Sequence, residues 1–114
     1  MERQDRKKLL ADYKQQPKIC GICAIKNMSN GKMWIETTLN MEGRRNRFEF
    51  IKSTNSGVPP LLRDDWQTYG PQAFCFEVLE ELKRGETQTD AEFAEDLKVL
   101  KEMWVAKFKA QDLY

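Results

Sequence analysis

The sequence predicts an α+β domain in which a small three-stranded antiparallel sheet is flanked by helices, with one further helix at the N-terminus. Two short apolar runs, residues 19–26 and 33–38, are separated by Asn30-Gly31, a dipeptide typical of hairpin turns. A third run, residues 73–79, is rich in aromatic and branched residues, as strands are. The segments between and after these runs carry apolar residues at helical spacing.

In the first strand, side chains should alternate between the two faces of the sheet. The alternation predicts one face with Gly21, Cys23 and Ile25, and an opposite face with Ile22, Ala24 and Lys26.

Capping residues and prolines delimit two helices after the hairpin. Asn40 is an N-cap for a helix expected to run to about Lys52. Pro59-Pro60 opens a second helix, and Gly70-Pro71 closes it, because proline is tolerated in the first turn and cannot extend the end. One apolar face of this second helix is expected to hold Leu62, Trp66 and Tyr69.

Two more helices lie at the ends of the chain. Thr89, with Glu92 as its capping-box partner, starts a C-terminal helix. Its buried stripe is expected to contain Phe93, Leu97, Leu100, Trp104 and Phe108. Residues 2–16 have the pattern of a charged helix that ends at Pro17. The expected division is therefore an N-terminal charged helix over 1–17 and a domain over 18–114.

The composition is that of an ordinary globular domain. With 114 residues, 32% of them charged and 40% apolar, the chain has enough apolar side chains for one folded domain and too few residues for two. A formal net charge of +1 gives no overall attraction to DNA or membranes, so nucleic-acid contact has to come from a local cluster. No apolar run approaches a membrane span, and the charged N-terminus is unlike a signal peptide, so we expect a cytoplasmic protein without membrane contact.

The cysteines predict no metal site. Cys20 and Cys23 form a C-x-x-C motif, which has redox and zinc interpretations. A zinc site usually takes four Cys or His ligands, whereas this chain has three Cys and no His. Residues three apart on a strand also point to opposite faces, so the thiols should not meet. We expect unmodified thiols that are buried or half-buried, with redox or metal chemistry as the less favoured alternative.

Five short motifs follow one another between Gly21 and Phe108: GICAIKN (21–27), NGK (30–32), TTLNMEGR (37–44), DWQTYG (65–70) and FCFEVLE (74–80). In this order and spacing they resemble the motifs of GIY-YIG nuclease domains, and the last two resemble a bacterial and phage branch of that family. Each motif alone is weak evidence, but the series is specific. The resemblance implies a GIY-YIG-like fold for residues 18–114.

The resemblance also assigns the positions of an active site. In the family, two tyrosines and an arginine surround the scissile phosphate. Here Cys23 and Trp34 stand at the tyrosine positions, and Arg44 stands at the arginine position. Tryptophan has no O–H, so we expect Trp34 to be a packing or platform aromatic rather than a catalytic group. Glu36 replaces the glycine of the second tripeptide.

The metal ligand of the family is also replaced. A glutamate three residues before a tryptophan of the last helix holds a divalent metal in the family, and Lys101 occupies that place before Trp104. An ammonium group repels a cation and supplies no oxygen ligand. Glu102 is the alternative ligand, although it lies about 100° around the helix. Phe48 stands where the family often has a histidine. We therefore expect no metal or other cofactor, with Mg²⁺ only if the chain is active.

A cluster of basic residues is the expected contact for nucleic acid. Arg44, Arg45 and Arg47 lie within four residues of one helix, and Lys26 and Lys32 precede them on the hairpin. They are expected to contact phosphate, and a solvated helix face is the alternative. Two more residues would extend the cluster if the fold brought them close, Lys52 and Arg63.

Two functions follow from the resemblance. The favoured one is a degenerate GIY-YIG domain that binds nucleic acid or a protein partner, with lost or weak cleavage, because each missing group supplies a separate part of transition-state stabilisation. The alternative is an active Mg²⁺-dependent DNA endonuclease with an altered site. Arg44 would then clamp the phosphate, and Glu102 or another carboxylate would hold the metal.

Overall fold

The structure of the protein is a computed structural model that describes residues 18–114. These residues form a three-stranded antiparallel sheet and three α-helices. The strands are β1 (Gly21–Asn27), β2 (Met33–Thr38) and β3 (Phe74–Glu81), arranged in the order β2-β1-β3. The predicted α+β class and antiparallel sheet are confirmed. The predicted charged helix and N-terminal segment, residues 1–17, lie outside the described residues.

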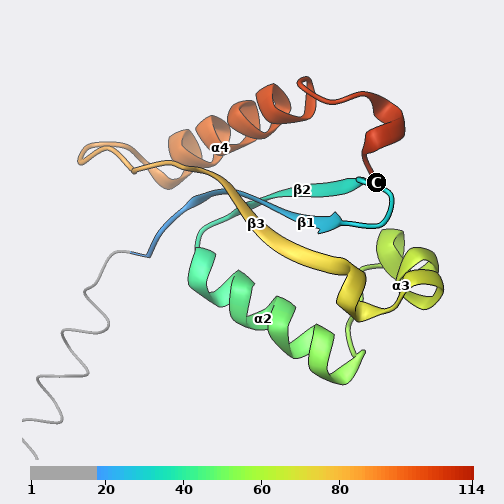
Figure 1. The fold of residues 1–114 in the computed structure, drawn as a ribbon. Coiled ribbons are helices and arrows are strands. Elements are labelled where there is room, and N and C mark those ends of the chain that lie inside the picture. Colours follow the sequence, from blue (N-terminus) through green and yellow to red (C-terminus); the bar gives the residue numbers. More distant parts are fainter. Residues whose placement is uncertain (1–17) are drawn as a thin grey trace, which may run out of the picture.

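The helices cover the two faces of this sheet. In Figure 1, α2 (Met41–Thr54) runs beneath the sheet and α4 (Asp90–Val105) crosses above it. The short α3 (Arg63–Tyr69) lies beside the end of the sheet at which β3 begins. Three 3₁₀ turns complete the described part of the chain: Pro60–Leu62, Pro71–Ala73 and Ala110–Asp112. In this part, no helix has the length and apolar character needed to cross a membrane.

The period-two alternation of β1 is confirmed. Ile25 packs on the side of α2 and α3, in a cluster that also contains Phe48, Ile51, Leu62, Trp66 and Phe74. Ile22 and Ala24 pack on the opposite side with Met33 and Ile35, against partly buried residues of α4 and the segment after it. Each face of the sheet therefore has its own core.

The β1–β2 hairpin forms, but its turn differs from a two-residue Asn-Gly turn. Strand pairing ends at Lys26 and Met33, and the Asn27 N–H donates to the Lys32 carbonyl over 2.8 Å. Gly31 has a φ of 78°, a conformation that favours glycine. Asn30 acts through its side chain instead, since Oδ1 accepts from the Lys32 N–H at 2.9 Å and Nδ2 donates to Asp65 at 3.0 Å.

Both predicted helix caps are present. Asn40 Oδ1 accepts from the Gly43 N–H at 3.0 Å, and Thr89 Oγ1 accepts from the Glu92 N–H at 3.2 Å. These bonds satisfy donors that the first turn of a helix leaves free. Helix α2 continues to Thr54, two residues beyond the expected end.

Two predictions about apolar stripes need correction. Leu62 and Trp66 are buried, but Tyr69 is 45% exposed. Tyr69 is the last residue of α3 and lies beyond the cluster that covers the other two. In the C-terminal helix, α4 ends at Val105, so Phe108 packs on the core from the turn that follows the helix.

Gly21 marks a close approach of strands β1 and β3. A Cβ atom at this position would lie 2.0 Å from the Glu80 carbonyl oxygen, which is far inside van der Waals contact. The pairing of β1 with β3 is irregular here, because Ile22 is opposite Glu80 while Cys23 is opposite Val78. Glycine at this position has no side chain, which lets the two backbones approach this closely beside the irregularity.

The C-terminal segment is held against the hairpin. The Tyr114 N–H donates to the Met33 carbonyl at 3.0 Å, and Leu113 forms a parallel bridge with Met33. The Tyr114 hydroxyl donates to Asp65 at 2.6 Å and accepts from Asn27 Nδ2 at 3.1 Å. The bond from Tyr114 is the main cause of a lowered Asp65 pKa.

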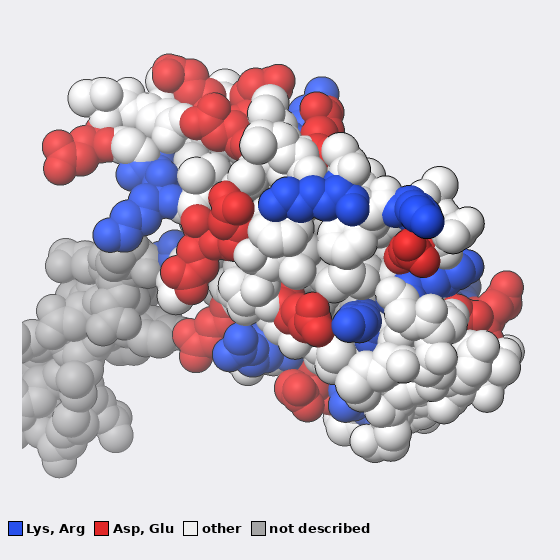
Figure 2. Space-filling model, turned by 45° about the horizontal axis from the view of Figure 1, so that its top comes forward, with Lys and Arg blue, Asp and Glu red and all other residues white. Residues whose placement is uncertain are grey.

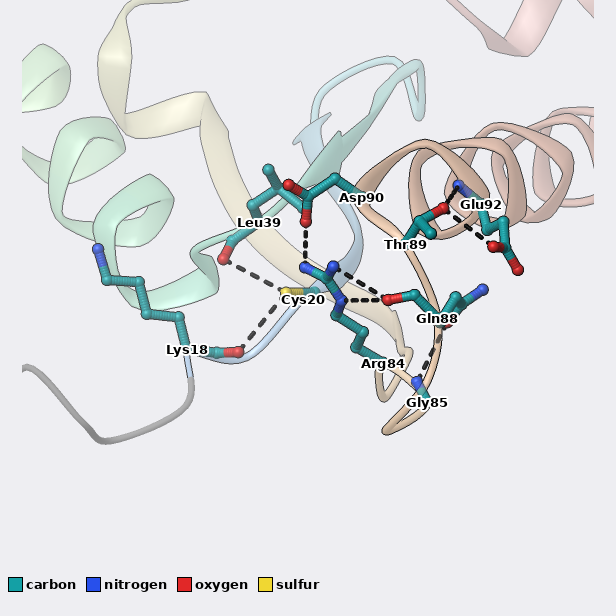
Figure 3. A network of polar contacts seen from close by, with 9 residues as sticks. All are labelled: Lys18, Cys20, Leu39, Arg84, Gly85, Gln88, Thr89, Asp90 and Glu92. Atoms are coloured by element: carbon teal, nitrogen blue, oxygen red, sulfur yellow. Dashed lines mark hydrogen bonds and ion pairs between the residues drawn. The ribbon is translucent and has the colours of Figure 1, made fainter.

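Polar contacts also fix the loop between β3 and α4 (Figure 3). The Arg84 guanidinium donates to the Gln88 carbonyl at 3.1 and 3.2 Å and pairs with Asp90 at the start of α4. The Cys20 thiol lies close by and donates to the carbonyls of Lys18 and Leu39. This loop therefore connects the end of the sheet to the first turn of α4.

Candidate functional site

A pocket of about 240 Å³ opens between α2 and the sheet face that α2 covers. We call it the sheet–α2 pocket. Its walls are mainly apolar and aromatic, and its polar groups come from β1, β2 and α2. The lining residues are Cys23, Ala24, Ile25, Trp34, Glu36, Arg44, Arg47, Phe48, Ile51, Gly57, Pro59 and Phe76.

Strand register brings together the positions that the sequence assigned. Cys23 is opposite Glu36, and Ile25 is opposite Trp34, so all four side chains belong to one face of the hairpin. Helix α2 begins three residues after β2 ends and returns along the sheet, which places Arg44 in its second turn beside Glu36. Cys23, Trp34 and Arg44 therefore line one pocket.

Arg44 is already paired within the protein. Its Nη2 lies 3.0 Å from Glu36 Oε2, and the two side chains are 39% and 25% exposed. A pair with this much solvent contact stabilises a fold by about 0–1 kcal/mol. Its main consequence is local, because Glu36 neutralises Arg44 at the place where the resemblance puts a phosphate. The sequence identified both residues but not their pairing, which depends on the position of α2 over β2.

Cys23 cannot act as a base at neutral pH. The side chain is 4% exposed, and burial raises the pKa of its thiol to about 11. The carboxylate of Glu36 raises this pKa further, while Arg44 lowers it. The group at the first tyrosine position is therefore a neutral thiol.

The three cysteines form no bridge. Cys20, Cys23 and Cys75 are free thiols. Cys20 lies outside β1, where it contacts the carbonyls of Lys18 and Leu39. Burial raises the pKa of Cys20 and of Cys75 as well.

Aromatic residues form the inner wall of the pocket. Trp34 is partly buried and lines it from β2. Phe48, at the position where the resemblance expects a histidine, is buried, and its ring centroid lies 6.1 Å from that of Phe76 on β3. Phe76 was missed as a site residue, although its place next to Ile25 follows once β3 pairs with β1.

The fold divides the basic residues between separate places. Arg44 and Arg47 line the pocket, and the Arg45 guanidinium lies over the Phe76 ring at 5.6 Å from its centroid. Lys32 lies over the Tyr114 ring at the hairpin. Lys26 is paired with Met33 and therefore faces the α4 side of the sheet. Lys52 lies over the Phe48 ring, and the Arg63 side chain donates to the Val58 carbonyl.

The residues in the pocket do not fit a divalent metal. Over residues 18–114, no group of three or more His, Cys, Asp or Glu side chains is arranged to hold a metal ion. Within the pocket, the donors are a carboxylate engaged with Arg44 and a protonated thiol, whereas Mg²⁺ binds several oxygen atoms. Lys101 and Glu102 belong to α4, which covers the other face of the sheet.

Charge is mixed on the face of the molecule that Figure 2 shows. On the face shown in Figure 2, Lys and Arg side chains are interspersed with Asp and Glu side chains, and no broad area has a single sign. This agrees with the formal net charge of +1. Attraction of an anion on this chain has to be local, as at the rim of the sheet–α2 pocket.

Two solved structures match the arrangement. A point mutant of the catalytic domain of the intron endonuclease I-TevI gives a TM-score of 0.62 at 18% identity, over 84% of this chain and 91% of that one. The catalytic domain of the homing endonuclease I-TevI gives 0.58 at 19% identity, over 83% of this chain and 95% of that one. This chain has the GIY-YIG nuclease fold. The GIY-YIG fold predicted from the motifs is therefore confirmed.

At 18–19% identity, the structural match extends to the fold and not to the chemistry of the site. The chain matches no family model, and no curated protein matches its sequence. The GIY-YIG scaffold of this chain thus carries a pocket whose polar residues have to be interpreted from their own geometry.

Proposed function

We propose that this chain is a degenerate GIY-YIG nuclease-like domain that binds nucleic acid through phosphate and cleaves it weakly or not at all. The observation that carries the proposal is the set of polar groups in the sheet–α2 pocket. Cys23, whose pKa is about 11, keeps its proton at neutral pH, and Glu36 is engaged with Arg44. Trp34 has no O–H, so the pocket offers no free base to activate water.

Phosphate binding is supported by the two arginines at the pocket. Two arginines, Arg44 and Arg47, and one carboxylate, Glu36, line the pocket, which leaves a local excess of one positive charge. Guanidinium groups bind phosphate oxygens in a planar, two-point geometry. Because Glu36 already holds Arg44, it acts as an internal competitor that an incoming phosphate has to displace.

Replacement of Glu36 distinguishes a competitor from a catalytic group. Glu36→Gln should free Arg44 and tighten binding of a short DNA by up to about five-fold, the range expected for a partly exposed ion pair. Glu42→Gln is the matched control, because it makes the same change at an exposed position of α2 outside the pocket. Loss of metal-dependent cutting in Glu36→Gln, without tighter binding, would assign Glu36 to catalysis instead.

Binding and cleavage assays test the proposal directly. The purified protein is incubated with single-stranded, double-stranded and branched DNA, with and without Mg²⁺ or Mn²⁺, and the expected result is binding without products. Metal-dependent cutting that Arg44→Ala abolishes would establish the endonuclease alternative. If none of these DNA forms and no RNA binds, a protein partner replaces nucleic acid as the expected ligand.

The salt dependence of binding locates the contact. Arg44→Ala and Arg47→Ala should each reduce the slope of log K against log salt by about 0.7–0.9, the value for one lost phosphate contact. Lys98→Ala is the matched control, since it removes one exposed positive charge from α4 on the opposite face of the sheet.

A further inference from the structure

We infer that the sheet–α2 pocket takes an unpaired nucleobase, while the phosphate of the same nucleotide binds the arginines at its rim. This inference rests on the proposed function and deepens it, because it names nucleic acid with unpaired bases as the ligand. Fully paired duplex would bind only through its phosphates.

The size and walls of the pocket suit a single flat ring system. Its volume of about 240 Å³ lies just below the roughly 300–1,000 Å³ of pockets that bury drug-sized ligands. Trp34 and Phe76 line it from two strands and Phe48 lines it from α2, so aromatic side chains from three elements contribute to its walls. Bases of single-stranded nucleic acid stack on such side chains irrespective of sequence.

The charged side chains of the pocket can contact the phosphate and the polar edge of a nucleotide. The apolar wall can receive the faces of a base, and Arg44 and Arg47 can receive its phosphate. The Glu36 carboxylate, displaced from Arg44 by that phosphate, can accept a hydrogen bond from a base amino group. An apolar ligand without an anionic group would leave Arg44 paired with Glu36 and would use neither guanidinium group.

Base pairing decides which nucleic acid can use the pocket. In a duplex, the faces of a base are stacked on its neighbours and its edge is paired, so the base has to be extruded before it can enter. An unpaired base in a single strand, a loop or a free nucleotide is already available. The pocket therefore favours unpaired nucleotides over duplex of equal length.

Fluorescence anisotropy with the full chain at low salt and without divalent metal tests this inference. Four labelled probes are compared: a single strand, the matching duplex, an abasic single strand with the same number of phosphates, and a mononucleotide. The intact single strand should bind at least about five-fold more tightly than the abasic strand, as stacking of one base predicts.

Variants assign the base contact to Trp34. Trp34→Ala should remove the preference for the intact strand over the abasic strand, whereas Trp34→Phe should keep part of it. Tyr69→Ala is the control, because it removes an exposed aromatic ring that does not line the pocket. Circular dichroism checks the fold of each variant. The comparison of intact and abasic strands needs no variant and decides the question even if Trp34→Ala unfolds.

Each outcome separates this inference from the proposed function. Equal binding of intact and abasic strands would overturn the base pocket and leave phosphate binding intact. Direct binding of the labelled mononucleotide that depends on Trp34, with no binding of any strand, would support the pocket and overturn the nucleic-acid role. Absence of binding by all four probes would overturn both.

Discussion

The two faces of the sheet use neighbouring residues of the same strands and yet differ in how completely they are covered. On the α4 face, Ile22, Ala24, Met33 and Ile35 are 0–6% exposed, and α4 with the segment after it packs over them. On the α2 face, Ile25 is buried, but the positions beside it on β1 and β2 border the open sheet–α2 pocket. These core residues on the α4 face are closed off from solvent, whereas the α2 face borders an open pocket.

Two tryptophans illustrate the same difference. Trp104 on the α4 side donates its Nε1–H to Glu80 at 3.2 Å, and Lys107 lies over its ring at 4.0 Å from the centroid. Trp34 lines the pocket on the α2 side. The first ring joins α4 to β3, whereas the second is partly buried and lines the pocket. Position in the fold, rather than residue type, sets the role of each indole.

The largest expected effect on stability comes from making the same substitution, isoleucine to alanine, once on each face of the sheet. Ile22→Ala should lower the free energy of unfolding by about 2–5 kcal/mol, because it leaves a closed cavity in the α4-side core. Ile25→Ala should cost less, since the space it opens joins an existing pocket and creates little new enclosed cavity. Urea unfolding measures both, and an equal or larger loss for Ile25→Ala would contradict the comparison.

A smaller loss of stability is expected from a substitution between strands β1 and β3 than from one in the core on a face of the sheet. Gly21→Ala places a methyl group 2.0 Å from the Glu80 carbonyl oxygen, so β1 or β3 has to shift. Overpacking of this kind costs about 1–3 kcal/mol. Gly85→Ala is the control, because its Cβ would meet no atom closer than 3.6 Å. Loss of stability confined to Gly21→Ala supports the close approach, and equal stability of the two variants would argue against it.

The smallest expected effect on stability at neutral pH comes from replacing Cys23 on the α2 face, where the prediction concerns how stability changes with pH. Its pKa is raised from 9.0 to about 11, so the folded thiol holds its proton at pH values where the unfolded thiol loses it. The stability that this shift contributes is therefore fully present below pH 9 and is lost as pH rises toward about 11. Unfolding of Cys23→Ser should show a weaker decline with pH over that window. Identical profiles for the two proteins would contradict a buried, protonated Cys23.

Much of the fold could be predicted because it depends on local signals. The Asn40 and Thr89 caps act within three residues along the chain, and the alternation in β1 follows from the geometry of any strand. Tyr69 was predicted wrongly because helical spacing does not show where the covering residues end. The predicted β1–β2 hairpin is present with its backbone hydrogen bonds. Its turn consists of the five residues between Asn27 and Met33 rather than of Asn30-Gly31 alone.

The site was less predictable, because its geometry depends on contacts between distant segments. The sequence identified Cys23, Trp34 and Arg44 by motif, and the structure brings them to one pocket. The ion pair of Glu36 with Arg44 depends on how α2 returns over β2. The contribution of Phe76 depends on the pairing of β3 with β1. No local signal in a single sequence encodes either arrangement.

The contact of Leu113 and Tyr114 with Met33 has a further consequence for behaviour in solution. Strand β2 lies at the border of the sheet, where unpaired backbone groups can recruit a strand from another molecule and start aggregation. The bridge to Leu113 and the bond from Tyr114 occupy that border at the hairpin end. The other border strand, β3, carries the charges of Glu77, Glu80 and Glu81, which discourage the same pairing. The chain thus protects its two sheet margins by different means, a tethered segment on one and electrostatic repulsion on the other.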